Sequence, residues 1–113
     1  MTDEEMDIVF HALAHATRRR ILDRVKAQPG RGVGELAAEF DVSRIAVMNH
    51  LAVLEQAGLI LSRREGRTRR LYLNALPIQR IRDRWIDAFE APFAARVADI
   101  QRLAEAAAKK EKS

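Results

Sequence analysis

The residues with the clearest chemistry in this sequence are arginines. Sixteen of the twenty basic residues are arginine, and five of them fall within eight positions: Arg63, Arg64, Arg67, Arg69 and Arg70. A guanidinium group can bind a phosphate or a guanine base through two parallel hydrogen bonds. Residues 43–84 hold nine basic and three acidic side chains, a net charge of +6, whereas the formal charge of the whole chain is +4. The arginines therefore predict a surface that binds a polyanion, and double-stranded DNA is the partner that we expect.

A second group of candidate residues lies just before these arginines, on a helix that we expect over residues 43–57. Ser43 is suited to cap this helix at its N-terminus, and Val47 and Leu51 repeat with helical spacing, so they should face the core. The opposite face presents the residues that we expect to read base edges in the major groove: Arg44, Ile45, Met48 and Asn49. Arginine can bind guanine, asparagine can bind adenine, and isoleucine can pack on the methyl group of thymine. Ser43 and His50 are expected to contact phosphates, together with the five arginines of the following hairpin.

Apolar spacing and turn residues predict the elements that position these groups. We expect a mainly α fold with one small β-hairpin. Its elements are a helix at 3–14, a helix capped by Thr17 and ended by residues 28–32, helices at 33–40 and 43–57, a hairpin at 59–73, and one or two C-terminal helices within 77–108. The tight turn between the third and fourth helices gives the spacing of a helix-turn-helix over 33–57, and the hairpin adds a wing. The sequence therefore predicts a winged helix-turn-helix, with residues 1–113 forming a single domain.

Four segments carry a resemblance to a known family. In order they are FHALAHATRRRIL at 10–22, VGELA at 33–37, VSRIAVMNHLAVLEQAGLI at 42–60 and EGR at 65–67. Their order and spacing resemble the arsenic-repressor (ArsR) family of winged helix-turn-helix transcription regulators over about residues 8–103. The resemblance implies a homodimer that pairs through its first and last helices, binds a partly palindromic operator and usually represses transcription.

Apolar surface also favours a homodimer. The first helix and the two C-terminal helices carry more apolar residues than one small core can cover. The expected interface residues are Val9, Phe10, Leu13, Trp85, Phe89, Phe93, Val97 and Ile100. For Trp85 and Phe89, the alternative is that they line an effector pocket. An inducer would be a further partner, and these residues do not identify one.

We expect no metal site and no cofactor. The chain has no cysteine and no histidine after His50. It therefore lacks the cysteine pairs, and the Asp and His ligands of the last helix, through which many members of the resembled family sense metals. Asp7, His11 and His15 form one row at helical spacing, and a zinc-responsive regulator that uses His11 and His15 is the alternative.

Enzymatic activity is not expected. Cysteine is absent, and none of the three serines, Ser43, Ser62 and Ser113, lies in the sequence context of an activated nucleophile. The alternative function is an interaction module that binds a protein in place of DNA, and the arginine-rich hairpin argues against it. No apolar run approaches the roughly 18 residues of a membrane-spanning helix, so we expect a cytoplasmic protein without membrane association.

The run Arg18-Arg19-Arg20 needs a partner. It lies in the first turn of the second helix, where the helix dipole makes positive charge unfavourable. We therefore expect a compensating negative group, with an acidic residue of the first or fifth helix favoured over a DNA phosphate.

Overall fold

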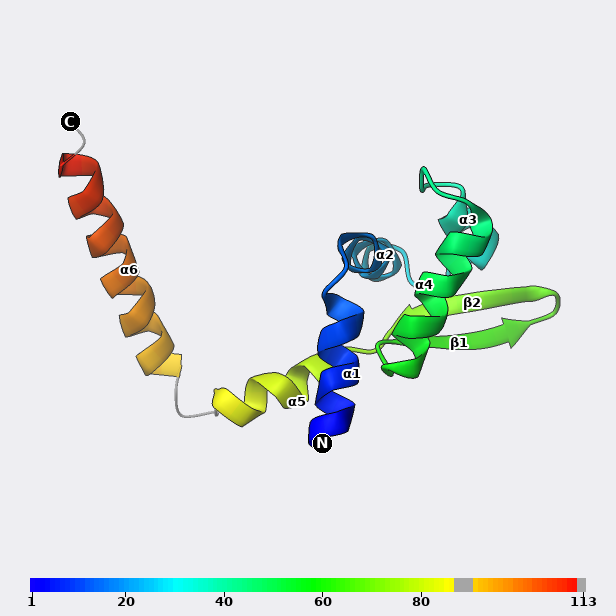
Figure 1. Cartoon of the computed structure of the whole chain (residues 1–113), viewed down its shortest axis with the longest axis horizontal. Coiled ribbons are helices and arrows are strands. Elements are labelled where there is room, and N and C mark those ends of the chain that lie inside the picture. The colour runs from blue at the N-terminus through cyan, green and yellow to red at the C-terminus, as the bar shows by residue number, and fades with distance from the viewer. Residues whose placement is uncertain (87–90, 112–113) are drawn as a thin grey trace. The chain divides into compact units, whose positions relative to one another are not determined.

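The computed structural model describes residues 1–86 and 91–111, and for residues 91–94, 110 and 111 it describes the backbone alone. It contains two compact units, Met1–Ile81 and Arg82–Ser113. The elements, labelled in Figure 1, are α1 (Asp3–Leu13), α2 (Ala16–Ala27), α3 (Val33–Ala37), α4 (Arg44–Gln56), β1 (Ile60–Glu65), β2 (Thr68–Leu73), α5 (Leu76–Trp85) and α6 (Ala91–Glu111). The expected mainly helical fold with one hairpin is confirmed. That residues 1–113 form a single domain stays a prediction.

The core of the first unit lies where α1, α2, α3 and α4 meet the base of the hairpin. Val47, Leu51 and Leu54 of α4 are all 0% exposed, as their spacing predicts. Ile60 and Leu71 join them from the two strands. Because this apolar stripe fixes the rotation of α4, the opposite face of the helix is presented to solvent.

The buried face of α1 includes a residue that was expected at a dimer interface. Its buried residues are Met6, Val9 and Ala12, at a spacing of three, whereas Phe10 is 45% exposed. Val9 is only 2% exposed and packs in the core of its own chain. The expectation that Val9 lies in a dimer interface is therefore wrong, because its side chain is already used inside the protomer.

The first two helices begin at different kinds of cap. Thr2 and Glu5 form a capping box at α1, in which the Glu5 N–H donates to Thr2 Oγ1 (3.1 Å) and the Thr2 N–H donates to Glu5 Oε2 (3.2 Å). The cap of α2 is His15, whose Nδ1 accepts a hydrogen bond from the Thr17 N–H (3.2 Å). The expected cap, Thr17, is wrong because that residue already lies inside the first turn of the helix.

The helix-turn-helix ends in a turn that leads directly into the hairpin. Gly58 has a φ of +74°, the left-handed conformation that glycine adopts without strain. The Leu59 N–H donates to the Leu54 carbonyl (3.0 Å) and the Gly58 N–H donates to the Glu55 carbonyl (2.9 Å). These two bonds form a Schellman motif, so β1 leaves the end of α4 in a defined direction.

The hairpin pairs β1 and β2 in antiparallel register from Ile60 opposite Leu73 to Glu65 opposite Thr68. On the other edge of β2, the Gly30 N–H donates to the Leu71 carbonyl (2.8 Å) and the Leu71 N–H donates to the Arg31 carbonyl (3.0 Å). Near the base of the hairpin, β2 is thus hydrogen-bonded on both of its edges. Its far end extends away from the helices, as Figure 1 shows.

The second unit contains the end of α5 and the long helix α6. Val97, Ile100 and Leu103 of α6 are exposed, at 43%, 65% and 71% respectively. In the described part of the chain, no helix combines the length and apolar character needed to cross a membrane.

Candidate nucleic-acid interface

The outer face of α4 carries the four residues expected to read bases. Arg44, Ile45, Met48 and Asn49 are all exposed, and Ile45 is the most exposed of the large apolar side chains in the described residues, at 72%. The helix begins with Ser43 as its N-cap, where Oγ accepts a hydrogen bond from the Ala46 N–H (3.1 Å). An isoleucine side chain exposed to water at the start of a helix is unfavourable, and the methyl group of a thymine would shield it.

The arginines of the hairpin divide into two groups, which the sequence alone did not separate. Arg69 forms an ion pair with Glu55 of α4. Arg70 donates from Nε to Glu65 Oε2 (2.9 Å) and from Nη1 to the Gly30 carbonyl (3.2 Å). The expectation that Arg69 and Arg70 bind DNA stays a prediction, and both guanidinium groups already have partners inside the protein.

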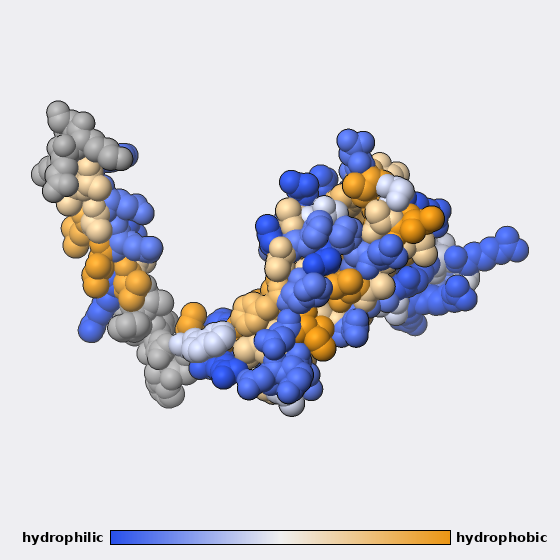
Figure 2. Space-filling view, viewed as in Figure 1, coloured by the Kyte–Doolittle hydropathy of each residue, from blue (hydrophilic) through white to orange (hydrophobic). Residues whose placement is uncertain are grey.

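Arg63, Arg64 and Arg67 form the second group. They are exposed, and none of them takes part in an ion pair recorded among the described residues. Hydrophilic side chains cover the hairpin in the space-filling view of Figure 2. These three cations remain available for a polyanion.

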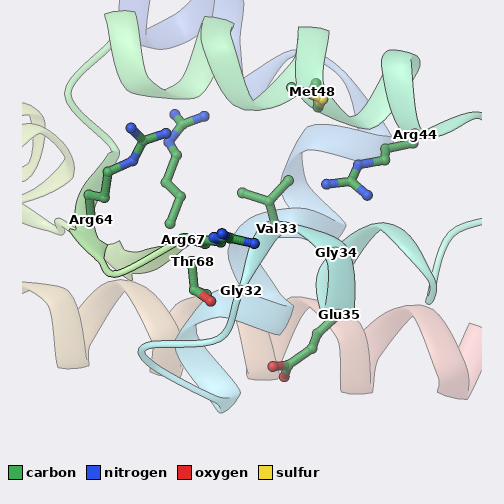
Figure 3. A pocket seen from close by; sticks show the side chains of 10 residues that line it. Gly32, Val33, Gly34, Glu35, Arg44, Met48, Arg64, Arg67 and Thr68 are labelled. Atoms are coloured by element: carbon green, nitrogen blue, oxygen red, sulfur yellow. The ribbon is translucent and has the colours of Figure 1, made fainter.

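A groove separates the hairpin from the helix-turn-helix. Its volume is about 490 Å³. The lining residues are Gly32, Val33, Gly34 and Glu35 at the start of α3, Arg44 and Met48 of α4, and Arg64, Arg67, Thr68 and Arg69 of the hairpin. Figure 3 shows the side chains of Arg44, Arg64 and Arg67 around this groove. The fold thus brings together cations that are distant in the sequence, and it places them beside the expected reading face.

His50, whose expected contact with the DNA backbone stays a prediction, lies against the start of α2. Its Nδ1 is 3.4 Å from Nη1 of Arg18, and its ring centroid is 4.6 Å from that of His15. Burial lowers the pKa of His50, and repulsion by His15 and by Arg18 lowers it further. The ring therefore favours the neutral state and joins α4 to α2, which is a packing role that the sequence did not indicate.

Two arginines of the run at the start of α2, Arg18 and Arg19, have their partners in α1. Arg18 is buried and donates from Nε to the Ala12 carbonyl (2.9 Å) and from Nη2 to the His11 carbonyl (3.0 Å). Arg19 donates from Nη1 to the Leu13 carbonyl (2.7 Å). The favoured internal partner is thus present, but it is the carbonyl end of α1 and not a carboxylate. That end carries the negative pole of the helix dipole, so it compensates the cations.

A second buried arginine fixes the segment before α3. Arg31 pairs with Glu39, with Nη1 donating to Oε2 at 3.1 Å. This hydrogen bond, opposed by desolvation and aided by the charges of Arg31 and Arg24, lowers the pKa of the Glu39 carboxyl group. The pair ties the residues that follow α3 to the strand-like segment that borders β2.

In the structure, His11 and His15, the histidines considered for zinc, do not lie in one row on a single helix. His15 uses its Nδ1 to cap α2 and faces His50, whereas His11 is exposed on α1. The described residues contain no group of three or more His, Cys, Asp or Glu side chains placed to hold a metal ion.

The remaining residues expected at a dimer interface differ in their exposure. Phe10 and Trp85 are 45% and 59% exposed, and Leu13 is partly buried against the core. Val97 and Ile100 are exposed on α6. Phe89 and the side chain of Phe93 lie outside the described residues.

An exposed helix-turn-helix beside a cationic hairpin defines the class of winged helix-turn-helix DNA-binding proteins. Comparison with known proteins agrees with this class. Residues 13–63 match a family profile described as a helix-turn-helix domain. The chain is 36% identical over 87 residues to the HTH-type transcriptional regulator YuzN of Bacillus subtilis, covering 72% of this chain and 95% of YuzN. It is 35% identical over 74 residues to the transcriptional repressor SdpR of the same organism, covering 66% of this chain and 81% of SdpR.

Solved structures give the family. An ArsR-like transcriptional regulator from Rhodococcus sp. RHA1 is 30% identical, with a TM-score of 0.65 over 89% of this chain and 93% of that chain. A domain from Mycobacterium bovis, described as a homodimeric winged helix-turn-helix DNA-binding domain, has the same fold at 24% identity, with a TM-score of 0.61 over 80% of this chain and 90% of that chain. The chain belongs to the ArsR family of transcriptional regulators, which are DNA-binding proteins and not enzymes.

Proposed function

We propose that this chain is a homodimeric repressor that binds a palindromic operator. The single observation that carries the proposal is the groove in which Arg44 of α4 and Arg64 and Arg67 of the hairpin surround one space. SdpR, a relative named as a transcriptional repressor, supports repression. The homodimeric domain from Mycobacterium bovis supports the assembly.

In this proposal α4 enters the major groove with its exposed face toward the bases. Arg44 binds guanine through two hydrogen bonds, Asn49 binds adenine, and Ile45 and Met48 pack on thymine methyl groups. The Ser43 hydroxyl, whose oxygen accepts from the Ala46 N–H, keeps its own proton to donate to a phosphate.

The hairpin supplies contacts that do not depend on sequence. Arg63, Arg64 and Arg67 bind phosphates or enter the neighbouring minor groove. Three such cations per protomer allow about six phosphate contacts in a dimer, each adding about −0.9 to the slope of log affinity against log salt. A slope of about −5 is therefore expected.

Exposed apolar side chains supply the dimer contacts. Phe10 of α1 and Val97, Ile100 and Leu103 of α6 are exposed, which is unfavourable in water and is relieved by a second copy. Sedimentation at micromolar concentration should give a dimer, and a monomer would contradict this part of the proposal. A dimer places two copies of α4 on half-sites about one helical turn apart.

The experiment that tests the reading geometry compares Arg44→Ala with Arg67→Ala in anisotropy titrations. Arg44→Ala should cost about 1–3 kcal/mol on the preferred sequence and should relax the sequence preference. Arg67→Ala should weaken binding to every sequence alike and reduce the salt slope by about 0.9 for each phosphate that the variant no longer binds. If the two variants behave in the same way, the assigned faces are wrong.

A further inference from the structure

Glu55 occupies a position on α4 that is unfavourable by itself. It lies one residue before the end of the helix, where the negative pole of the dipole repels a carboxylate. Its carboxylate forms an ion pair with Arg69 of β2, and the two side chains are only 28% and 34% exposed. A partly buried carboxylate at a helix C-terminus therefore has a specific cationic partner on the hairpin.

The strand register shows on which face of the hairpin this ion pair lies. Arg69 is paired across the strands with Arg64, whereas Arg70 is paired with Arg63. Since successive side chains of a strand point to opposite faces, Arg64 and Arg69 share the face that lies toward α4. The apolar anchors Ile60 and Leu71 hold the base of the hairpin, and the Glu55–Arg69 pair ties it to α4 farther toward its turn.

We propose that Glu55 and Arg69 are positioning residues that clamp the wing to the reading helix. The clamp sets the distance between Arg44 on α4 and the unpaired Arg64 and Arg67 on the hairpin, so that helix and wing contact one duplex in a single geometry. Arg69 itself binds no phosphate, because Glu55 already neutralises its guanidinium group. This inference rests on the proposed DNA binding.

The test uses four variants of the full chain: Glu55→Gln, Arg69→Gln, the charge swap Glu55→Arg with Arg69→Glu, and Arg67→Gln as a control that removes an unpaired cation. Circular dichroism and thermal unfolding establish that each variant is folded. Anisotropy titrations at several salt concentrations give the affinity for the preferred duplex and the salt slope. Hydrogen exchange measures the protection of the hairpin amides in the free protein.

We expect each single change in the pair to weaken specific binding by up to about fivefold, the upper end of what a partly exposed ion pair contributes. Arg69→Gln should leave the salt slope unchanged, whereas Arg67→Gln should reduce it by about 0.9 for each phosphate that is no longer bound. Both single changes should speed amide exchange in the hairpin. The charge swap should restore the slow exchange and most of the affinity, because it rebuilds the ion pair with its charges reversed.

Two results would overturn the clamp. One is a decrease of the salt slope in Arg69→Gln equal to that in Arg67→Gln, which would make Arg69 a phosphate ligand. The other is a folded charge-swap protein with hairpin exchange as fast as that of the single variants. Failure of the unaltered chain to bind any duplex would contradict the proposed function instead, and the exchange measurement would still decide whether the clamp exists.

Discussion

Replacement of Arg18 by methionine should destabilise the protein more than any change on the reading face. Methionine keeps an unbranched apolar stem but removes the guanidinium group, which donates to the Ala12 and His11 carbonyls at 2.9 and 3.0 Å. Both carbonyls lie in the last turn of α1, where backbone carbonyls have no amide four residues later in the helix to accept from, and the His11 carbonyl also accepts from the Ala14 N–H at the C-cap (3.2 Å). A hydrogen bond to a charged group contributes about 1.5–3 kcal/mol. Arg18→Met removes two such hydrogen bonds, of which the one to the His11 carbonyl is only partly buried. The expected loss in the free energy of unfolding is about 3–5 kcal/mol.

Urea denaturation followed by circular dichroism measures this loss. The matched control is Arg19→Met, because Arg19 also donates to a carbonyl of α1, that of Leu13, but does so at the exposed surface, where water can replace it. The control should lose less than about 1 kcal/mol. A native domain is stable by only about 5–15 kcal/mol, so the difference between the two variants is large on this scale. If Arg18→Met lowers the free energy of unfolding no more than Arg19→Met does, the packing of α1 against α2 does not depend on Arg18.

Acidification should destabilise the protein through His50. Burial, together with repulsion by His15 and Arg18, lowers its pKa in the folded state, so the unfolded chain takes up the proton first. The contribution is fully present above roughly pH 6.5, the ordinary pKa of histidine, and decreases as the pH falls below it. Urea titrations across this range should show a smaller decrease for His50→Gln, and an equal decrease would refute the assignment. Ser43→Ala removes the cap of α4 and should cost about 1 kcal/mol in the same assay, whereas no change would mean that the hydroxyl is not needed as a cap.

The hairpin shows how far the sequence could predict the site. Five arginines within eight residues correctly indicated a cationic wing, but their roles depend on strand register. The register places Arg69 toward α4 and within reach of Glu55, and it places Arg70 beside the Gly30 carbonyl. These partners lie far away in the sequence, so local patterning could not reveal them.

In the helices, too, the sequence predicted the features that neighbouring residues determine, and it did not predict those that depend on residues packed from elsewhere in the fold. The inward face of α4 and the end of that helix at Gly58 followed from spacing and from a glycine, because both are local properties. The partners of Arg18 were missed because backbone carbonyls carry no sequence signal. Val9 was wrongly placed at a dimer interface because apolar spacing on a helix does not by itself distinguish a core residue from an interface residue, and Val9 packs in the core beside the small Ala12.

The central claim is that the cations around the groove bind operator DNA, and fluorescence anisotropy tests it most directly. The intact chain is titrated into the duplex just upstream of its own gene and into a scrambled duplex, at two salt concentrations, first with EDTA and then with zinc. We predict tighter binding to the upstream duplex, a salt slope of about −5, and no effect of zinc. Absence of binding to both duplexes at low salt, or an affinity that does not change with salt, would contradict the claim.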